Sequence, residues 1–260
     1  MPFTPAHTMA VLPLVRWRKR LLLDPTCLVI GSMAPDFEYF VRARLKGGVG
    51  HSMLGIALWC IPVTIALAVT YHHLVKWTVL MALPARISRR AVSVMGRDWP
   101  SREWPVARTL GSLAVSAALG AMTHLAWDGV THPDGWTVER VAVLRTIHDM
   151  PWGRVPLHRV IQHASSVLGL TVVGYVIYRA LRHAPERAVP SAARLRTWLI
   201  FAACMMAIVA VAFMRLRRIN HFDAAEIVVA SISGMLGAAI LTSLIVRAQT
   251  VRFRDAVRPG

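Results

Sequence analysis

The chain has 260 residues, of which 55% are hydrophobic and 17% are charged, and its mean hydropathy is +0.49. Soluble domains carry about 25% charged residues, so this composition argues against a soluble domain and favours a membrane protein. The net charge of +17 comes from basic residues between apolar runs, where they meet anionic lipid, and no nucleic-acid-binding motif accompanies them.

We expect mainly irregular structure in the N-terminal region, residues 1–51. It contains one amphipathic helix near residues 6–22 and an apolar run over residues 27–33 that stops at Pro35. Residues 1–13 lack the cationic start and apolar stretch of a signal peptide. We therefore expect membrane insertion to depend on internal spans.

Five segments after this region are long and apolar enough to cross a bilayer. They cover residues 52–71, 110–127, 160–178, 198–214 and 227–246. A sixth span follows if the apolar residues 74–83 also enter the bilayer. We expect an all-α integral membrane bundle of about five transmembrane helices, forming one domain with an N-terminal region (1–51), a bundle (52–246) and a basic tail (247–260).

Alternation of the spans predicts that polar residues gather at one membrane face. His51 precedes the first span, and the second span returns to the same face, where it ends on His124 and Asp128. The third span begins there with Gln162 in its first turn, and residues 220–223 join the fourth span to the fifth. Lys and Arg are slightly more numerous on the opposite face, which favours an extracytoplasmic position for the polar face.

The spacing of His124 and Asp128 is typical of a metal site on a helix. Side chains four residues apart lie on one helical face and can share an ion. The competing interpretation, a helix end whose His and Asp only meet water, is equally good for this pair alone. His7 and Asp36 each stand beside an apolar stretch with a proline; the alternative for them is a polar interface belt.

Together, His7, Asp36, His51, His124 and Asp128 offer three imidazoles and two carboxylates. Such donors suit zinc first, and also manganese or iron. They allow one ion with an open water position or two ions bridged by a carboxylate. We expect Asp36 or Asp128 to be catalytic, either as that bridge or as a general base.

Several other polar residues are weaker candidates. His132 is either an outer partner of the site or, by preference, a turn residue, and Gln162 is an expected hydrogen-bond partner on the third span. Arg42, Arg44 and Lys46 could bind an anionic lipid headgroup, although a solvated or lipid-facing basic patch explains them equally well.

The stretches that carry these residues resemble a known bacterial family. They are PFTPAH, LDPTCLVIGSMAPDFEYF, GHSMLG, THLAWDGVTHPDGW and QHASSVLG. They resemble domain of unknown function family 4184, whose members are multi-pass membrane proteins, and are distantly similar to YdjM-like inner-membrane proteins described as metal-dependent hydrolases. The shared order of motifs falls on His7, Asp36, His51, His124 and Asp128, and the resemblance implies a hydrolase without naming its substrate.

Three functions remain open at this point. The first is a membrane-embedded, metal-dependent hydrolase that acts on lipid or phosphoester headgroups. The second is a non-catalytic metal- or ligand-binding protein or a transporter, although transporters keep polar groups near the bilayer midplane rather than at span ends. The third is a structural membrane protein, which the number of converging polar groups disfavours.

Overall fold

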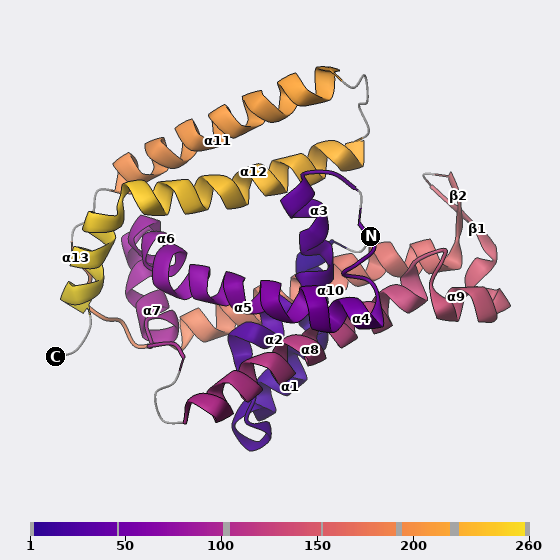
Figure 1. Ribbon diagram of the computed structural model, residues 1–260, viewed down its shortest axis with the longest axis horizontal. Helices are drawn as coiled ribbons and strands as arrows, with labels where there is room; N and C mark the ends of the chain where they lie inside the picture. The colour runs from indigo at the N-terminus through magenta and orange to yellow at the C-terminus, as the bar shows by residue number, and fades with distance from the viewer. Residues whose placement is uncertain are drawn as a thin grey trace. The chain divides into compact units, whose positions relative to one another are not determined.

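The computed structural model describes residues 3–45, 47–100, 105–151, 153–190, 194–218 and 224–257 (Figure 1). Helices dominate this part of the chain, and strands β1 (Ile147–Met150) and β2 (Gly153–Pro156) form one antiparallel hairpin. Within the described residues, five helices are long and apolar enough to cross a membrane: Met53–Ala82, Val106–Arg140, Leu157–Arg182, Arg194–Ala212 and Glu226–Ile245. The chain is therefore an all-α, multi-pass membrane protein, as the sequence predicts.

The first span is longer than expected. Residues 74–83 do not form a separate span but continue the first helix, which passes through α4 (Met53–Gly55), η3 (Ile56–Cys60), α5 (Ile61–Thr70), η4 (Tyr71–Val75) and α6 (Lys76–Ala82). The helix ends at Leu83, whose backbone is extended. Pro84 follows, and a residue before proline is disfavoured in the helical conformation. The sequence 71–83 contains no such break, so one helix runs through it.

Contacts within the chain divide it into two compact units. The first contains η1 (Thr4–His7), α1 (Thr8–Leu21), α2 (Pro25–Gly31), η2 (Ala34–Asp36), the start of the first span, α8 (Val106–Thr131), α9 (Trp136–Arg140), η5 (Ala142–Arg145), the hairpin and most of α10 (Leu157–Arg182). The second contains α3 (Phe37–Arg42), η4, α6, α7 (Ala85–Met95), α11 (Arg194–Arg218), α12 (Ala224–Ile245) and α13 (Arg247–Val257).

In the first unit, α2 packs closely against α8. Asp24 caps α2 by accepting a hydrogen bond from the Cys27 amide at 2.8 Å, and its own amide donates to the Ser116 hydroxyl on α8 at 2.8 Å. A Cβ atom at Gly120 would lie 2.6 Å from the Leu28 carbonyl oxygen. The small residues of α8 thus allow the two backbones to touch.

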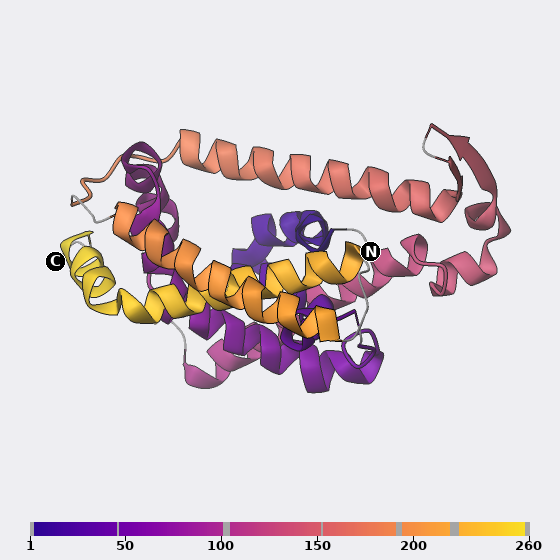
Figure 2. The ribbon, with the colours of Figure 1, turned by 90° about the horizontal axis from the view of Figure 1, so that it is seen from above.

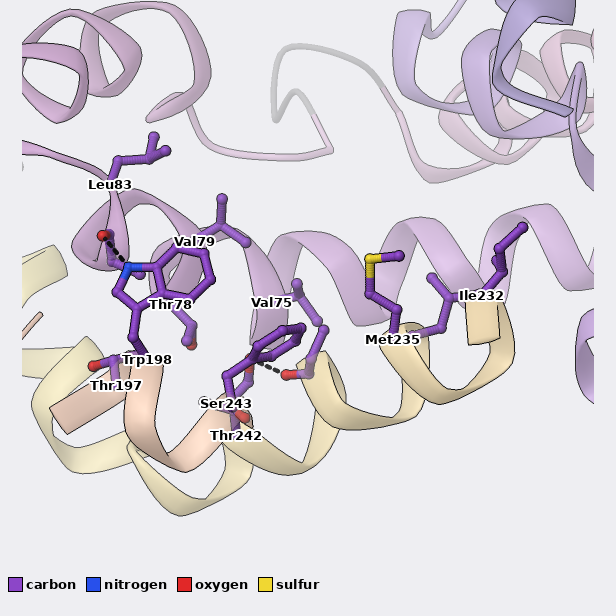
Figure 3. Close-up of a pocket in the computed structure, with 14 residues that line it drawn as sticks. Val75, Thr78, Val79, Leu83, Thr197, Trp198, Ile232, Met235, Thr242 and Ser243 are labelled. Carbon is purple, nitrogen blue, oxygen red and sulfur yellow. Dashed lines mark hydrogen bonds between the residues drawn. The ribbon is translucent and has the colours of Figure 1, made fainter. Parts of the chain in front are cut away.

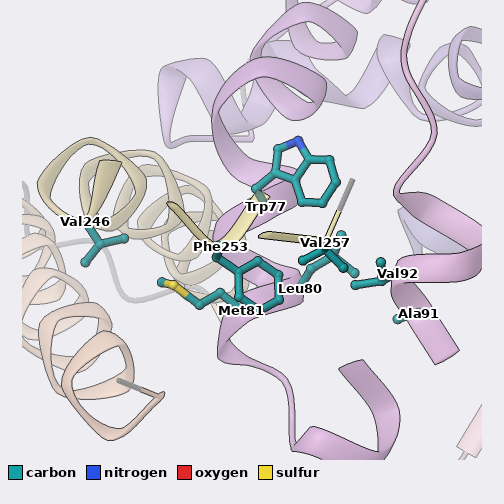
Figure 4. Close-up of a cluster of buried hydrophobic side chains, with 8 residues drawn as sticks. All are labelled: Trp77, Leu80, Met81, Ala91, Val92, Val246, Phe253 and Val257. Carbon is teal, nitrogen blue, oxygen red and sulfur yellow. The ribbon is translucent and has the colours of Figure 1, made fainter. Parts of the chain in front are cut away.

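In the second unit, α11 and α12 run side by side in both views (Figures 1 and 2). Residues expected to form a basic tail instead continue into α13, where Phe253 and Val257 pack on Trp77 and Leu80 of α6 (Figure 4). An apolar cavity of about 360 Å³ lies between η4–α6, α11 and α12 (Figure 3). Trp198 at its edge donates a hydrogen bond to the Ala82 carbonyl at 3.0 Å.

Candidate metal centre

The centre is built around His124 and Asp128, which lie one turn apart on α8. His124 is fully buried and Asp128 is 8% exposed. His124 Nε2 is 3.3 Å from Asp128 Oδ2. Helical spacing thus turns both side chains inward to the same point of the first unit.

The orientation of His124 is determined by the end of α2. Its Nδ1 atom lies 2.8 Å from the carbonyl oxygen of Ser32. Because a carbonyl only accepts hydrogen bonds, Nδ1 carries a proton, and Nε2 is the ring nitrogen that remains for an ion. Nε2 faces the carboxylates of Asp128 and Asp36, and the Nε2 to Asp36 Oδ1 distance is 3.6 Å.

Asp36 enters the centre from η2, directly after Pro35, and is fully buried. Its Oδ2 atom accepts a hydrogen bond from the Thr4 hydroxyl at 2.5 Å. Burial alone would raise the pKa of Asp36, but the imidazoles of His124 and His51 and the Thr4 hydroxyl outweigh burial and hold this pKa well below its usual range. Asp36 is therefore a carboxylate whose Oδ1 atom remains available.

His7 closes the centre from the N-terminal side. It stacks on His124 with ring centroids 3.9 Å apart, and its Nε2 atom lies 3.6 Å from Asp128 Oδ1. The preceding segment is tied to α10, because the Phe3 amide donates to the Ser166 hydroxyl at 3.1 Å. Burial, followed by repulsion from His124, lowers the pKa of His7 to about 4, so its imidazole is neutral and can act as a ligand.

His51 lies at the entrance of the centre. The next residue, Ser52, caps the first span by accepting a hydrogen bond from the Gly55 amide at 2.9 Å. His51 Nε2 lies 3.4 Å from Asp36 Oδ1 and 3.7 Å from Asp128 Oδ2. Its side chain is 22% exposed, so the centre opens toward solvent on this side.

Four of these atoms alternate around a ring of close approaches. His51 Nε2, Asp36 Oδ1, His124 Nε2 and Asp128 Oδ2 are separated in turn by 3.4, 3.6, 3.3 and 3.7 Å. These separations are long for hydrogen bonds. Two ligand atoms about 2.1 Å from one ion lie about 3.0–3.4 Å apart at angles of about 90–110°. A contraction of a few tenths of an ångström would therefore let the ring enclose a divalent ion.

Several buried polar atoms that lack a hydrogen-bond partner among the described residues also fit a bound ion. Among the described residues, buried atoms without a hydrogen-bond partner include His7 Nδ1 and Nε2, Asp36 Oδ1, His124 Nε2 and Asp128 Oδ1. Each such atom costs about 1–3 kcal/mol when it is left unsatisfied. Two donor sets, one of His7, His124 and Asp128 and the other of Asp36, His51 and His124, have ligand atoms within 4.8 Å of one another. Nitrogen and carboxylate donors of this kind suit zinc, manganese or iron.

The residues of this centre lie in a part of the chain that matches a protein family. Residues 1–246 match a domain of unknown function, DUF4184. The chain belongs to the DUF4184 family. No curated protein and no solved structure matches it. The matched region of this DUF4184 chain includes all five residues that the sequence predicts as ligands.

His132 lies closer to the DUF4184 centre than its preferred interpretation as a turn residue suggests. It follows the last turn of α8, and its Nδ1 atom lies 3.3 Å from Asp128 Oδ1 and 3.3 Å from the Thr131 hydroxyl. Its side chain is 20% exposed. The pattern His124, Asp128, His132 recurs every four residues, and this spacing is the signal that points to the contact.

Gln162 takes a different position from the predicted ligands. It is buried on α10, where its backbone carbonyl accepts hydrogen bonds from the hydroxyls of Ser165 and Ser166 at 3.0 and 2.9 Å. Ser165 accepts a bond from the Trp127 indole at 3.2 Å, next to Asp128. The described contacts connect Gln162 to the packing of α8 on α10 and not to a ligand atom.

Two of the basic residues considered for headgroup binding, Arg42 and Arg44, belong to the second unit and have acidic neighbours there. Arg42 pairs with Glu38 at 3.2 Å, and Arg44 lies 3.9 Å from Glu226. Lys46 lies outside the described residues, as do residues 220–223. Two groups that sequence reasoning missed are the Thr4 hydroxyl and the Ser32 carbonyl, which orient Asp36 and His124.

Proposed function

We propose that this DUF4184 protein is a membrane-embedded, metal-dependent hydrolase of the bacterial inner membrane. The observation that carries the proposal is the convergence of buried imidazole and carboxylate groups, of which Asp36 Oδ1, His124 Nε2 and Asp128 Oδ1 have no hydrogen-bond partner among the described residues. Zinc suits this donor set best, and manganese and iron are alternatives. The resemblance of the same five positions to the motif pattern of YdjM-like proteins supports hydrolysis.

His7, Asp36, His51 and His124 would hold the ion. A divalent ion supplies Lewis-acid chemistry and lowers the pKa of water from 15.7 to about 7. Thr4 and the Ser32 carbonyl orient two of the ligands, which keeps the geometry ready for binding. Deep burial of Asp36 and His124 excludes bulk water from the inner side of the centre.

Asp128 is the better placed of the two carboxylates for proton transfer. Its side chain is 11% exposed, whereas that of Asp36 is fully buried and bonded to Thr4. A general base has to reach the water or substrate whose proton it accepts. We therefore assign Asp36 to holding the ion. Asp128 would accept a proton or bridge two ions.

The position of the centre along the spans favours a substrate at the membrane surface. Only Ser52 separates His51 from the span Met53–Ala82, so the open side lies at headgroup level rather than at the midplane. A lipid or phosphoester headgroup would approach past His51. Anionic lipid is also the partner expected for a chain of net charge +17.

The test is turnover by purified protein loaded with zinc or manganese, assayed on panels of phospholipids and soluble phosphoesters. We expect hydrolysis by the wild type, and loss of hydrolysis on chelation and in Asp36→Asn. Asp149→Asn is the matched control, because Asp149 is exposed on the hairpin and should leave turnover unchanged. A metal-loaded protein that hydrolyses nothing would favour the alternative function, non-catalytic metal binding or transport.

A further inference from the structure

The two oxygen atoms of Asp128 face different pairs of imidazoles. Oδ2 lies 3.3 Å from His124 Nε2 and 3.7 Å from His51 Nε2. Oδ1 lies 3.3 Å from His132 Nδ1 and 3.6 Å from His7 Nε2. One carboxylate is thus placed between two sets of nitrogen ligands. We propose that the centre holds two divalent ions bridged by Asp128, an inference that rests on the proposed metal binding.

The number of donors supports two positions. Catalytic zinc ions usually take three protein ligands and keep one position open. His7, Asp36, His51, His124, Asp128 and His132 all converge on the centre. Six side chains exceed what one such ion uses. They match two ions with about three protein ligands each.

His124 gives a second argument, because both compact donor sets include it. Its Nδ1 atom is engaged with the Ser32 carbonyl, so only Nε2 can bind an ion, and one lone pair serves one ion. If Nε2 joins Asp36 and His51, the set around His7 needs another nitrogen. His132 Nδ1, which approaches the same Asp128 oxygen as His7 does, can supply it.

The sequence spacing along α8 explains how Asp128 comes to lie between two sets of imidazoles. His124, Asp128 and His132 follow one another at intervals of four residues, with the Cα atoms of His124 and Asp128 about 6 Å apart along the helix axis and His132 directly after the helix end. The histidine on one side of Asp128 meets one oxygen, and the histidine on the other side meets the second oxygen. A carboxylate approached from both sides is suited to bridge two ions.

Two ions narrow the substrate class. Ions about 3.5–4 Å apart stabilise both the attacking and the leaving oxygen of an in-line displacement at phosphorus. Each set reaches solvent through one partly exposed histidine, His132 in one set with 20% of its side chain exposed and His51 in the other with 22%. Because the proposed centre also lies at headgroup level, we infer that phosphoesters are hydrolysed here.

The experiment is the stoichiometry of Zn²⁺ bound to the purified full-length protein, measured by elemental analysis after removal of free metal. We expect two Zn²⁺ per wild-type chain, one in His132→Ala and two in His163→Ala, a matched control because His163 is exposed on α10. His132→Asp retains a ligand and should recover binding of the second ion. In the wild type loaded with Mn²⁺, electron paramagnetic resonance should show a spin-coupled pair that His132→Ala lacks.

The outcomes separate the two proposals. One Zn²⁺ per wild-type chain, unchanged by His132→Ala and without spin coupling, would overturn the two-ion centre and leave a single-ion hydrolase intact. No bound Zn²⁺ or Mn²⁺ in the wild type would overturn both. Since the wild type alone decides between none, one and two ions, the test does not depend on the folding of a variant.

Discussion

The hydroxyl of Thr4 donates a hydrogen bond of 2.5 Å to Oδ2 of Asp36, across 32 residues of chain. Both groups are buried. The bond occupies one carboxylate oxygen and leaves Oδ1 directed at His51 and His124. It therefore ties the N-terminal segment to one of the proposed ligands.

Replacing Thr4 tests that contact. Thr4→Val retains the shape of the side chain but removes the donor, and we expect it to weaken Zn²⁺ binding by about 10–100-fold, the usual effect of losing a partner behind a ligand. Thr4→Ser retains the hydroxyl and should stay near wild type. Competition with a zinc chelator measures both affinities; equal affinities for the Val and Ser variants would show that Thr4 does not orient Asp36.

Two glycines of α8 provide a test of the packing that positions His124. A Cβ atom at Gly120 would lie 2.6 Å from the Leu28 carbonyl oxygen and the Ser32 amide nitrogen, whereas at Gly111 it meets no described atom within 4 Å. We expect Gly120→Ala to destabilise the protein by about 1–3 kcal/mol through overpacking. Gly111→Ala should be neutral or slightly stabilising. Thermal unfolding in detergent compares them, and equal midpoints would contradict this account of the α2–α8 contact.

Gly169 and Gly174 on α10 form a similar pair for the N-terminal segment. A Cβ atom at Gly169 would lie 2.7 Å from the Ala6 carbonyl oxygen, while at Gly174 it has no described neighbour within 4 Å. Gly169→Ala should displace the segment that carries His7 and lower Zn²⁺ affinity, by about 10-fold or more. Gly174→Ala is the control, and its Zn²⁺ affinity should equal that of the wild type. The idea fails if Gly169→Ala binds Zn²⁺ as tightly as Gly174→Ala.

The orientation of the spans can be measured by cysteine labelling. Asp149 lies on the exposed hairpin before α10 and His183 follows the end of α10, so they belong to opposite membrane faces. In a background without the native cysteines, a membrane-impermeant maleimide should label Asp149→Cys in intact cells and should not label His183→Cys. The reverse pattern would place the proposed metal centre on the cytoplasmic side.

The sequence was sufficient to predict the spans because apolar length alone determines which helices can cross a bilayer. Alternation of spans also predicts that His51, His124 and Asp128 share one end of the bundle, where the structure brings them together. The alternative of a sixth span over residues 74–83 is wrong. Whether an apolar stretch continues the preceding helix depends on where the next helix-breaking residue occurs. Here that break is Pro84.

Other features depend on contacts between segments far apart in the sequence, which hydrophobic periodicity does not predict. His7 and Asp36 lie in irregular segments, so helix counting could not place them, and only motif resemblance joined them to the other residues. Gly111 and Gly120 look equivalent in the sequence, yet only Gly120 touches α2. The partners of Asp36 and His124, the Thr4 hydroxyl and the Ser32 carbonyl, are 32 and 92 residues away from them.

The metal content of the wild type, measured beside His124→Ala and His163→Ala, tests the central claim most directly. After dialysis against metal-free buffer, the wild type and His163→Ala should retain zinc, manganese or iron. His124→Ala should retain less metal than either of them, because a direct ligand contributes more than the about 10–100-fold of an outer partner. Equal metal content in all three proteins, or a wild type that retains none, would contradict the metal centre.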